Sequence, residues 1–255
     1  MNKALRFLAV PTLALGALAL SGVPAMAHDG SDHYQSTLGQ LNGSSASGSV
    51  TVDVTGNQAH AVLKVSGLPA TFMDAPYPHV QHIHGGAQGV CPAPSADKDG
   101  DQVVSTTEGA PSYGAIVTTL STSGDTSPAA GLDLKVAGQG AAYTVDRTFE
   151  LNAETKAALE AGTAVVVVHG LDPATLSAAG QAAKSDLVPS LPLAATSPAL
   201  CGTLKAGQMQ MPTGGADTGI TQDTGTDATA LAIGGGLTLV ALAGGAYAIR
   251  RRTAA

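Results

Sequence analysis

Short segments with a strand-like hydrophobic pattern are the feature that most restricts what this chain can fold into. Alternation of apolar and polar residues with a period of two is typical of strands that bury one face. Aromatic residues make up only 3% of the sequence and tryptophan is absent, so Val, Leu, Ile and Ala must form the core. The expected strands are 47–54, 58–68, 115–121, 132–136, 143–151, 163–169 and 200–204. They predict an all-β domain, an antiparallel sandwich or barrel.

One short helix is predicted between two of these strands. Asn152 is a favourable N-cap, Glu154 lies in the first turn, and residues 156–160 are good helix formers. Gly162 can end the helix. The Pro-flanked segment 189–198 predicts a loop before the last strand.

The N-terminal segment has the order of a secretory signal peptide: basic residues, an apolar run over 7–20, and the small-residue triplet 25–27. A membrane anchor is the alternative. The apolar run is too short for it, because a bilayer core of about 30 Å needs about 20 helical residues. We therefore expect a signal peptide at 1–27, export, and a mature chain that begins at His28.

The C-terminal region predicts a membrane anchor. Residues 228–249 contain no charged side chain and are followed by three arginines, which favour the cytoplasmic side. A buried core helix is the alternative, but the many glycines would weaken a soluble helix. We expect a cell-surface protein on the cytoplasmic membrane. Its predicted parts are an extracellular domain (28–208), a flexible Gly/Thr/Asp-rich stalk (209–227), a transmembrane helix (228–249) and a cytoplasmic tail (250–255).

A pentapeptide in the stalk offers another mode of attachment. Residues 215–219 read Gly-Ala-Asp-Thr-Gly, which resembles the Leu-Ala-x-Thr-Gly sorting signal of sortases, with Gly215 in place of the leading Leu. Cleavage at Thr218 would attach the protein to the cell wall. Retention in the membrane is the favoured expectation.

Charge restricts the partners of the exported part. Residues 28–227 hold 7 of the 12 basic side chains and all 19 acidic ones, a net charge of −12. Such a surface repels nucleic acids and other polyanions, and its simplest role is solubility. The sequence also lacks a GxSxG elbow, an HExxH motif and a phosphate-binding loop.

Cys91 and Cys201 are the two cysteines of the chain. Export places them in an oxidising compartment, which favours one long-range disulfide. A free-thiol nucleophile is the alternative.

The histidines carry the most chemistry. Three of the seven lie in the segment 79–84, and His169 follows a run of valines. Residues two apart in a strand share a face, so His82 and His84 can converge on one ion, and imidazole suits copper or zinc. A hydrogen-bonded histidine cluster that ties loops to the sheet is the alternative.

The order of these motifs resembles the copper/zinc superoxide dismutases and the related chordin-type (CHRD) domains, over about residues 35–205. The matching elements are Gly67-Leu68, the HxxHxH motif at 79–84, Cys91, the Val-rich strand that ends at His169, and Leu200-Cys201-Gly202. The resemblance implies a Greek-key β-barrel, a Cys91–Cys201 disulfide, copper ligands at His82, His84 and His169, and a structural neighbour at His79.

Two departures from the family pattern refine the expected function. No histidine lies between His84 and His169, where the family keeps its bridging ligand and its zinc ligands, so we expect no zinc site. Pro198 stands where the dismutases carry an arginine that attracts superoxide. A CHRD-like metal-binding or interaction module, rather than an enzyme, is therefore the first expectation. An extracellular copper-dependent, dismutase-like oxidoreductase is the second.

Two further histidine positions offer weaker possibilities. His60 has the pattern of a surface residue, but it would replace a missing ligand if its face packed against the HxH strand. His28, freed as a new N-terminus and followed by His33, could bind copper through its amine and ring. A frayed terminus is the simpler interpretation.

Residues 97–108 match a twelve-residue EF-hand calcium loop. Gln102 occupies the position of the usual sharp-turn glycine, and three nearby prolines leave little room for flanking helices. An acidic solvated loop is the alternative. We expect calcium to rigidify the segment between Cys91 and the strand that begins at Ala115. The predicted ligands are Asp97, Asp99, Asp101, Val103 through its carbonyl, Ser105 and Glu108.

Overall fold

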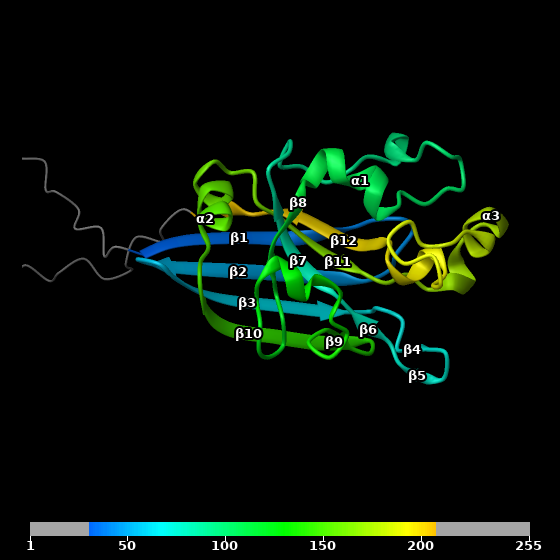
Figure 1. Ribbon diagram of the computed structural model, residues 1–255, viewed down its shortest axis with the longest axis horizontal. Coiled ribbons are helices and arrows are strands. Elements are labelled where there is room, and N and C mark those ends of the chain that lie inside the picture. The colour runs from blue at the N-terminus through cyan, green and yellow to red at the C-terminus, as the bar shows by residue number, and fades with distance from the viewer. Residues whose placement is uncertain (1–30, 208–255) are drawn as a thin grey trace, which may run out of the picture. The chain divides into compact units, whose positions relative to one another are not determined.

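The computed structural model describes residues 31–207 (Figure 1). The predicted signal peptide, stalk, transmembrane helix and cytoplasmic tail lie outside the described residues, as do His28 and the sorting-like pentapeptide. Among residues 31–207, no helix has the length and hydrophobicity needed to cross a bilayer.

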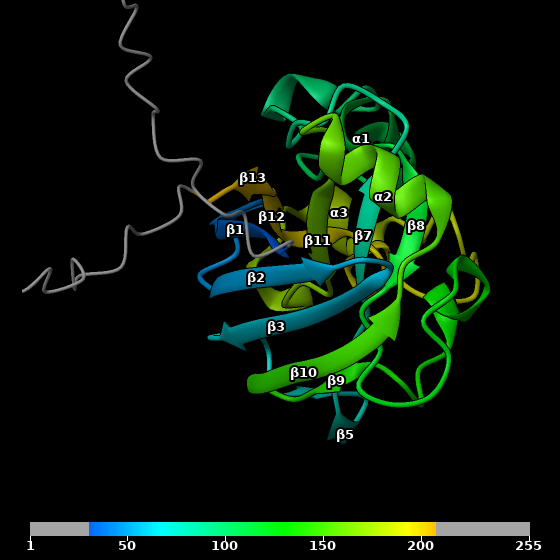
Figure 2. The ribbon, with the colours of Figure 1, turned by 90° about the vertical axis from the view of Figure 1, so that its left-hand side faces the viewer.

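The described chain is mostly β, as predicted, and its main feature is one curled antiparallel sheet. The strand order is β10-β3-β2-β1-β12-β11-β7-β8, and β13 pairs with β1. In Figure 2, β2 and β3 lie on one side and β7 and β8 on the other, joined through β1, β12 and β11. The strands are β1 (Ser31–Gln40), β2 (Ser47–Thr55), β3 (Gln58–Ser66), β7 (Gln81–Gly85), β8 (Ala115–Thr119), β10 (Ala142–Glu150), β11 (Val165–His169), β12 (Pro198–Thr203) and β13 (Lys205–Ala206).

Two short two-stranded pairings complete the β structure of the described region. β4 (Thr71–Phe72) pairs with β5 (Ala75–Pro76), and β6 (Pro78–His79) pairs with β9 (Gly138–Gln139). The β6–β9 pairing brings the segment after β8 back to the start of the HxH strand.

The hydrophobic pattern explains which face each strand buries. In β2 and β3 alternate residues enter the core, among them Val50, Val52, Leu63 and Val65. β7 and β11 are buried on both faces, which is why the sequence of β11 is a continuous valine run. Val166 and Val168 belong to the main core, whereas Val165 and Val167 pack on the opposite face with Tyr113 and Cys201.

Side chains bridge the two ends of the strand path, β8 and β10. The Arg147 guanidinium on β10 donates to the Ser121 carbonyl at 3.0 Å and to the Gly124 carbonyl at 3.1 Å. Asn152, just after β10, donates to the Val117 carbonyl on β8 at 2.6 Å. These contacts give the sheet a barrel-like form although β8 and β10 are not paired with each other.

The predicted helix is confirmed as α2 (Ala153–Glu160). Its N-cap is Asn152, whose side chain accepts from the Thr155 amide, and Gly162 follows its C-terminal end. The expectation of a single helix is wrong, because the described residues contain two more, α1 (Thr106–Tyr113) and α3 (Ala178–Ala182). Four 3₁₀ turns lie at Pro94–Ala96, Pro128–Leu132, Pro173–Thr175 and Leu193–Ala195.

The sequence itself contains the N-terminal motif of α1. Ser105 and Glu108 form a reciprocal capping box, in which each side chain accepts from the other residue's backbone amide. This motif stabilises the first turn even though Pro111 lies inside the helix. The expectation that the nearby prolines leave little room for a flanking helix is therefore wrong on the C-terminal side of the loop.

The expected strand at 132–136 is also wrong. Pro128 begins a 3₁₀ turn that ends at Leu132, and an irregular loop follows. Leu132 and Leu134 alternate in sequence, but 52% and 51% of their surfaces are exposed, so the alternation does not reflect a core-facing strand.

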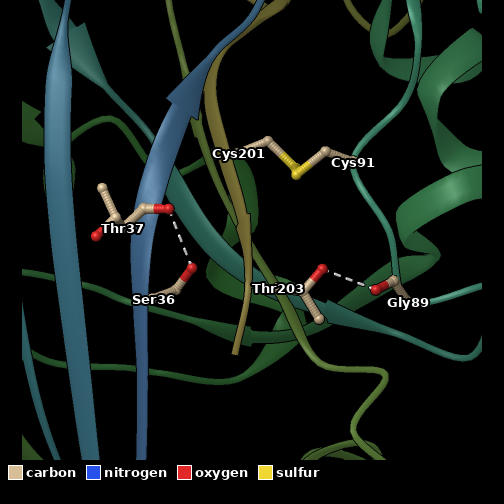
Figure 3. Close-up of a disulfide and its surroundings, with 6 residues drawn as sticks. All are labelled: Ser36, Thr37, Gly89, Cys91, Cys201 and Thr203. Atoms are coloured by element: carbon tan, nitrogen blue, oxygen red, sulfur yellow. Dashed lines mark hydrogen bonds between the residues drawn. A yellow bond between two sulfur atoms is a disulfide. The ribbon is translucent and has the colours of Figure 1, made fainter. Parts of the chain in front are cut away.

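The predicted disulfide is confirmed between Cys91 and Cys201, which are 110 residues apart, and the free-thiol alternative is wrong. Figure 3 shows Cys201 on β12 and Cys91 on the segment that follows β7. Close by, the Thr203 hydroxyl donates to the Gly89 carbonyl at 2.8 Å. Both contacts attach the segment between β7 and α1 to the outer face of the sheet.

Candidate metal centre

Neighbouring strands bring three histidines together. β7 pairs antiparallel with β11, with His82 opposite Val167 and His84 opposite Val165. Ile83, between the two histidines, points into the main core, so both imidazoles project from the outer face of the sheet. His169 ends β11 and is held at β7 by a 3.0 Å hydrogen bond from its amide to the Val80 carbonyl. We call His82, His84 and His169 the histidine triad.

The triad is compact and buried. One ring nitrogen from each member lies within 4.8 Å of a ring nitrogen of the other two. The ring centroids are 5.3 Å to 6.2 Å apart, and no member has more than 3% of its surface exposed. The structure therefore brings together the three side chains that the resemblance implied as copper ligands.

Each ring is fixed by a hydrogen bond to a backbone carbonyl. His82 uses Nε2 toward the Gly131 oxygen at 2.8 Å, and His84 uses Nδ1 toward the Gly114 oxygen at 2.9 Å. His169 uses Nδ1 toward the Thr196 oxygen at 2.7 Å. A carbonyl oxygen only accepts, so each of these ring nitrogens carries the proton in the neutral imidazole.

The other nitrogen of each ring has no partner. These atoms are Nδ1 of His82, Nε2 of His84 and Nε2 of His169, and they are the only buried side-chain nitrogen or oxygen atoms of the described residues without a hydrogen bond. An unsatisfied buried polar group costs about 1–3 kcal/mol. Three such lone pairs in one cluster indicate a site for a positively charged ligand.

Burial keeps the triad neutral. It lowers the pKa of His84 to about 3 and that of His169 to about 4. The pKa of His82 also lies well below its ordinary value, first because of burial and then because of the neighbouring His169 and His84. Neutral imidazoles are the form that binds metal.

The triad fits a copper or zinc ion. Both ions accept imidazole nitrogens, at about 2.0–2.1 Å in the case of zinc. The hydrogen bond from the second ring nitrogen to a carbonyl is the usual way in which a protein orients a metal-bound histidine. The alternative is a histidine cluster that only ties loops to the sheet. This alternative accounts for the three hydrogen bonds to carbonyls but does not explain the three unpartnered ring nitrogens.

Two glycines allow the carbonyl partners to approach. Gly114, which ends α1, has a φ of +93°, and a Cβ there would overlap the Gly85 carbonyl. At Gly131 a Cβ would lie 2.8 Å from the Ile116 side chain and 3.5 Å from Nε2 of His82. Sequence reasoning missed these residues, together with Thr196, because a backbone carbonyl has no sequence pattern of its own.

His79 lies beside the triad and not in it. One of its ring nitrogens contacts the His169 carbonyl at 2.9 Å, and the other contacts the Pro69 carbonyl at 3.0 Å. The ring is buried and packs on Tyr77. His79 therefore links β6 and the segment before it to the end of β11.

The remaining described histidines lie on other strands. His60 is exposed on β3 and contacts the Asp146 carboxylate at 2.8 Å, and His33 on β1 contacts the Asp53 carboxylate. Neither belongs to the group of potential metal ligands that the triad forms.

The structure brings together half of the predicted calcium ligands. Carboxylate oxygens of Asp97, Asp99 and Glu108 lie within 4.8 Å of one another. Gln102 adopts a φ of +71°, so the sharp turn forms without a glycine. Asp101, Val103 and Ser105 are not in the group: the Asp101 carboxylate accepts from the Val103 amide, and the Ser105 hydroxyl caps α1.

A largely apolar cavity of about 280 Å³ opens onto the triad. It lies between the outer face of β7 and β8 and the segments that contain α1 and Thr196. Apolar side chains that line it include Val80, Ala110, Ile116, Leu132 and Leu187. A metal held by the triad would therefore face this cavity.

Comparison with known proteins gives no further guide to the function. No family model matches the chain, and no curated protein matches it.

Proposed function

We propose that this chain is an exported, membrane-anchored cell-surface protein whose β domain is a CHRD/dismutase-like Greek-key barrel that binds one copper ion through the histidine triad. The observation that carries the proposal is a cluster of three buried histidines, each of which has one ring nitrogen without a hydrogen-bond partner. The order of strands supports the proposed barrel topology, because β3 pairs with β10 and β7 pairs with β11 across long connections.

Copper is favoured over zinc for two reasons. Nitrogen sites bind divalent copper more tightly than zinc in the general affinity order of first-row metals. The motif resemblance also assigns copper to these three positions. Bound copper would supply one-electron redox chemistry, while the chain's own residues hold the imidazoles neutral, orient them through the carbonyls of Gly114, Gly131 and Thr196, and exclude bulk water.

A binding or interaction module is the first form of this proposal, and a dismutase-like oxidoreductase is the second. Rapid turnover of superoxide, an anion, benefits from positive charge near the metal. No lysine or arginine lines the cavity within the described residues. Residues 31–207 also hold 15 acidic side chains against 7 basic ones. Both observations favour the binding module.

Metal content tests the proposal directly. The purified full chain, loaded with copper and freed of excess, should contain one copper ion per chain by mass spectrometry of the metal. His84→Ala or His169→Ala should abolish stoichiometric loading. His60→Ala is the matched control, because His60 is exposed and hydrogen-bonds to Asp146, and it should load fully.

Two results would overturn the proposal. A wild-type chain that retains neither copper nor zinc would leave the triad as a structural cluster. Equal loading of wild type and His84→Ala would place the metal elsewhere. Superoxide decay is measured in parallel on the copper-loaded chain. A rate close to that of a diffusion-limited enzyme would favour the oxidoreductase over the binding module.

A further inference from the structure

The cavity above the triad restricts what can reach the metal. Its volume of about 280 Å³ is near the lower limit of small-molecule sites in proteins. One liquid water occupies about 30 Å³, so a six-membered ring fits and a drug-sized molecule does not. The ligand that this space accepts is therefore small.

The lining is poorly suited to charged ligands. Most side chains around the cavity are aliphatic or threonine, and within the described residues its ionisable side chains are the triad itself and Tyr113, whose hydroxyl donates to the Thr106 carbonyl. An ion that enters must give up its hydration without a compensating hydrogen bond, which is costly. An uncharged apolar molecule gains free energy from the same burial.

The rim of the cavity is apolar, with an acidic residue beside it. Leu132 and Leu187 line the cavity and yet are 52% and 44% exposed, which makes them two of the five exposed large hydrophobic residues of the described chain. Asp186 precedes Leu187, and its carboxylate accepts from the Thr107 amide at 2.8 Å. Thr107 itself lines the cavity. A fixed negative charge thus lies next to the entrance.

Ions of each sign meet repulsion at one end of the cavity, an anion at the entrance and a cation at the metal. Asp186 and the acidic surface oppose the approach of an anion. A metal ion held by neutral imidazoles has an uncompensated positive charge, which opposes the approach of a cation. An uncharged molecule avoids both penalties.

We infer that the ligand or substrate that reaches the metal of the histidine triad is a small, uncharged, largely apolar molecule no larger than a six-membered ring. This inference rests on the proposed metal site. It assigns Leu132 and Leu187 as the residues that determine selectivity at the entrance.

The first test compares an uncharged and an anionic probe on the copper-loaded full chain. Pyridine and azide are titrated separately, and binding is followed by the visible absorption and electron paramagnetic resonance of the copper. Leu187→Lys or Leu132→Lys should raise azide affinity about fivefold, the effect of one unit charge near a protein surface, and lower pyridine affinity. Leu134→Lys is the matched control, because Leu134 is equally exposed but does not line the cavity.

The ratio of azide to pyridine affinity decides the outcome. A ratio that rises fivefold or more in the rim variants and stays unchanged in Leu134→Lys supports the inference. If the ratio of azide to pyridine affinity is the same in the wild type, in both rim variants and in the control, the inference is overturned, because the rim then does not select ligands. Absence of copper in the wild type would instead refute the proposed function.

A second test needs no metal. Xenon occupies dry apolar cavities and avoids wet polar ones. Under xenon pressure, the methyl resonances of Ile116 and Leu187 in the metal-free full chain should shift, while those of Leu134 should not. Ala110→Phe, which fills the cavity, should remove the response. No xenon shift at Ile116 in the wild type would overturn the inference whether or not the chain binds copper.

Discussion

His84 on β7 donates a 2.9 Å hydrogen bond from Nδ1 to the carbonyl oxygen of Gly114, the residue that ends α1. The bond joins two segments 30 residues apart and leaves Nε2 of His84 as the ring nitrogen without a hydrogen-bond partner. The position requires a glycine. Gly114 has a φ of +93°, and a Cβ added there would collide with the Gly85 carbonyl.

Replacement of Gly114 by Ala should therefore damage both the fold and the site. The strained backbone and the overlap with Gly85 should lower the free energy of unfolding by at least about 2 kcal/mol. Copper affinity should fall as well, because His84 loses its orienting partner. Urea unfolding and copper titration measure the two effects.

Gly124→Ala is the control for this prediction. Gly124 also has a positive φ, of +68°, but a Cβ added there would meet no atom within 4 Å. The change should therefore lower the free energy of unfolding by only about 1 kcal/mol. Equal losses of stability and of copper affinity in Gly114→Ala and Gly124→Ala would contradict the role assigned to Gly114.

The metal-free protein should lose stability in mild acid. The folded pKa values of His84, about 3, and His169, about 4, lie below the ordinary value of 6.5. The unfolded chain therefore binds more protons, so the stability that the neutral rings provide is complete above pH 6.5 and declines as the pH falls toward 4. The loss should be on the order of a few kcal/mol. Urea unfolding between pH 7 and pH 4.5 measures it, and His169→Gln should flatten the dependence while His60→Gln should not. An unchanged stability across this range would refute the prediction.

Reduction of the disulfide should destabilise the domain and weaken the site together. A cross-link between residues 110 apart removes loop entropy from the unfolded chain worth about 4–5 kcal/mol in the chain-entropy model. Cys91 also precedes α1 and Gly114 on the segment attached to β12. Cys91→Ser with Cys201→Ser should lower the urea midpoint and the copper affinity. A double variant that unfolds and loads copper like the wild type would show that the hydrogen bonds of this segment, among them Thr203 to Gly89 and Asn42 to Val104, retain it without the disulfide.

Calcium should stabilise the loop 97–108. One carboxylate oxygen from each of Asp97, Asp99 and Glu108 already lies within 4.8 Å of the other two, so calcium would relieve the mutual repulsion of the carboxylates. Millimolar calcium should raise the thermal midpoint of the full chain by several degrees, a shift of about 1–2 kcal/mol. Asp99→Asn should remove the shift, and Asp125→Asn, on a different exposed loop, should retain it. No calcium effect on the wild type, by thermal unfolding or calorimetry, would leave the motif as a helix-capping acidic loop.

The sequence alone determined the elements whose patterns are local. Period-two alternation located β2, β3 and β10, the valine run located β11, and Asn152 located α2, because burial of one face and capping are read from neighbouring residues. Two cysteines in a chain expected to be exported predicted one disulfide, and the HxH spacing placed His82 and His84 on one strand face.

The tertiary structure decided how the site is completed. Whether Leu132 and Leu134 lie in a strand or in an exposed loop depends on the 3₁₀ turn that begins at Pro128, and alternation alone does not specify this. The sequence could identify three histidines but not which ring nitrogen of each would be left without a hydrogen-bond partner. That choice depends on the carbonyls of Gly114, Gly131 and Thr196, which reach the triad from segments far along the chain. Backbone carbonyls are the same in every residue, so only long-range packing determines which ones become partners.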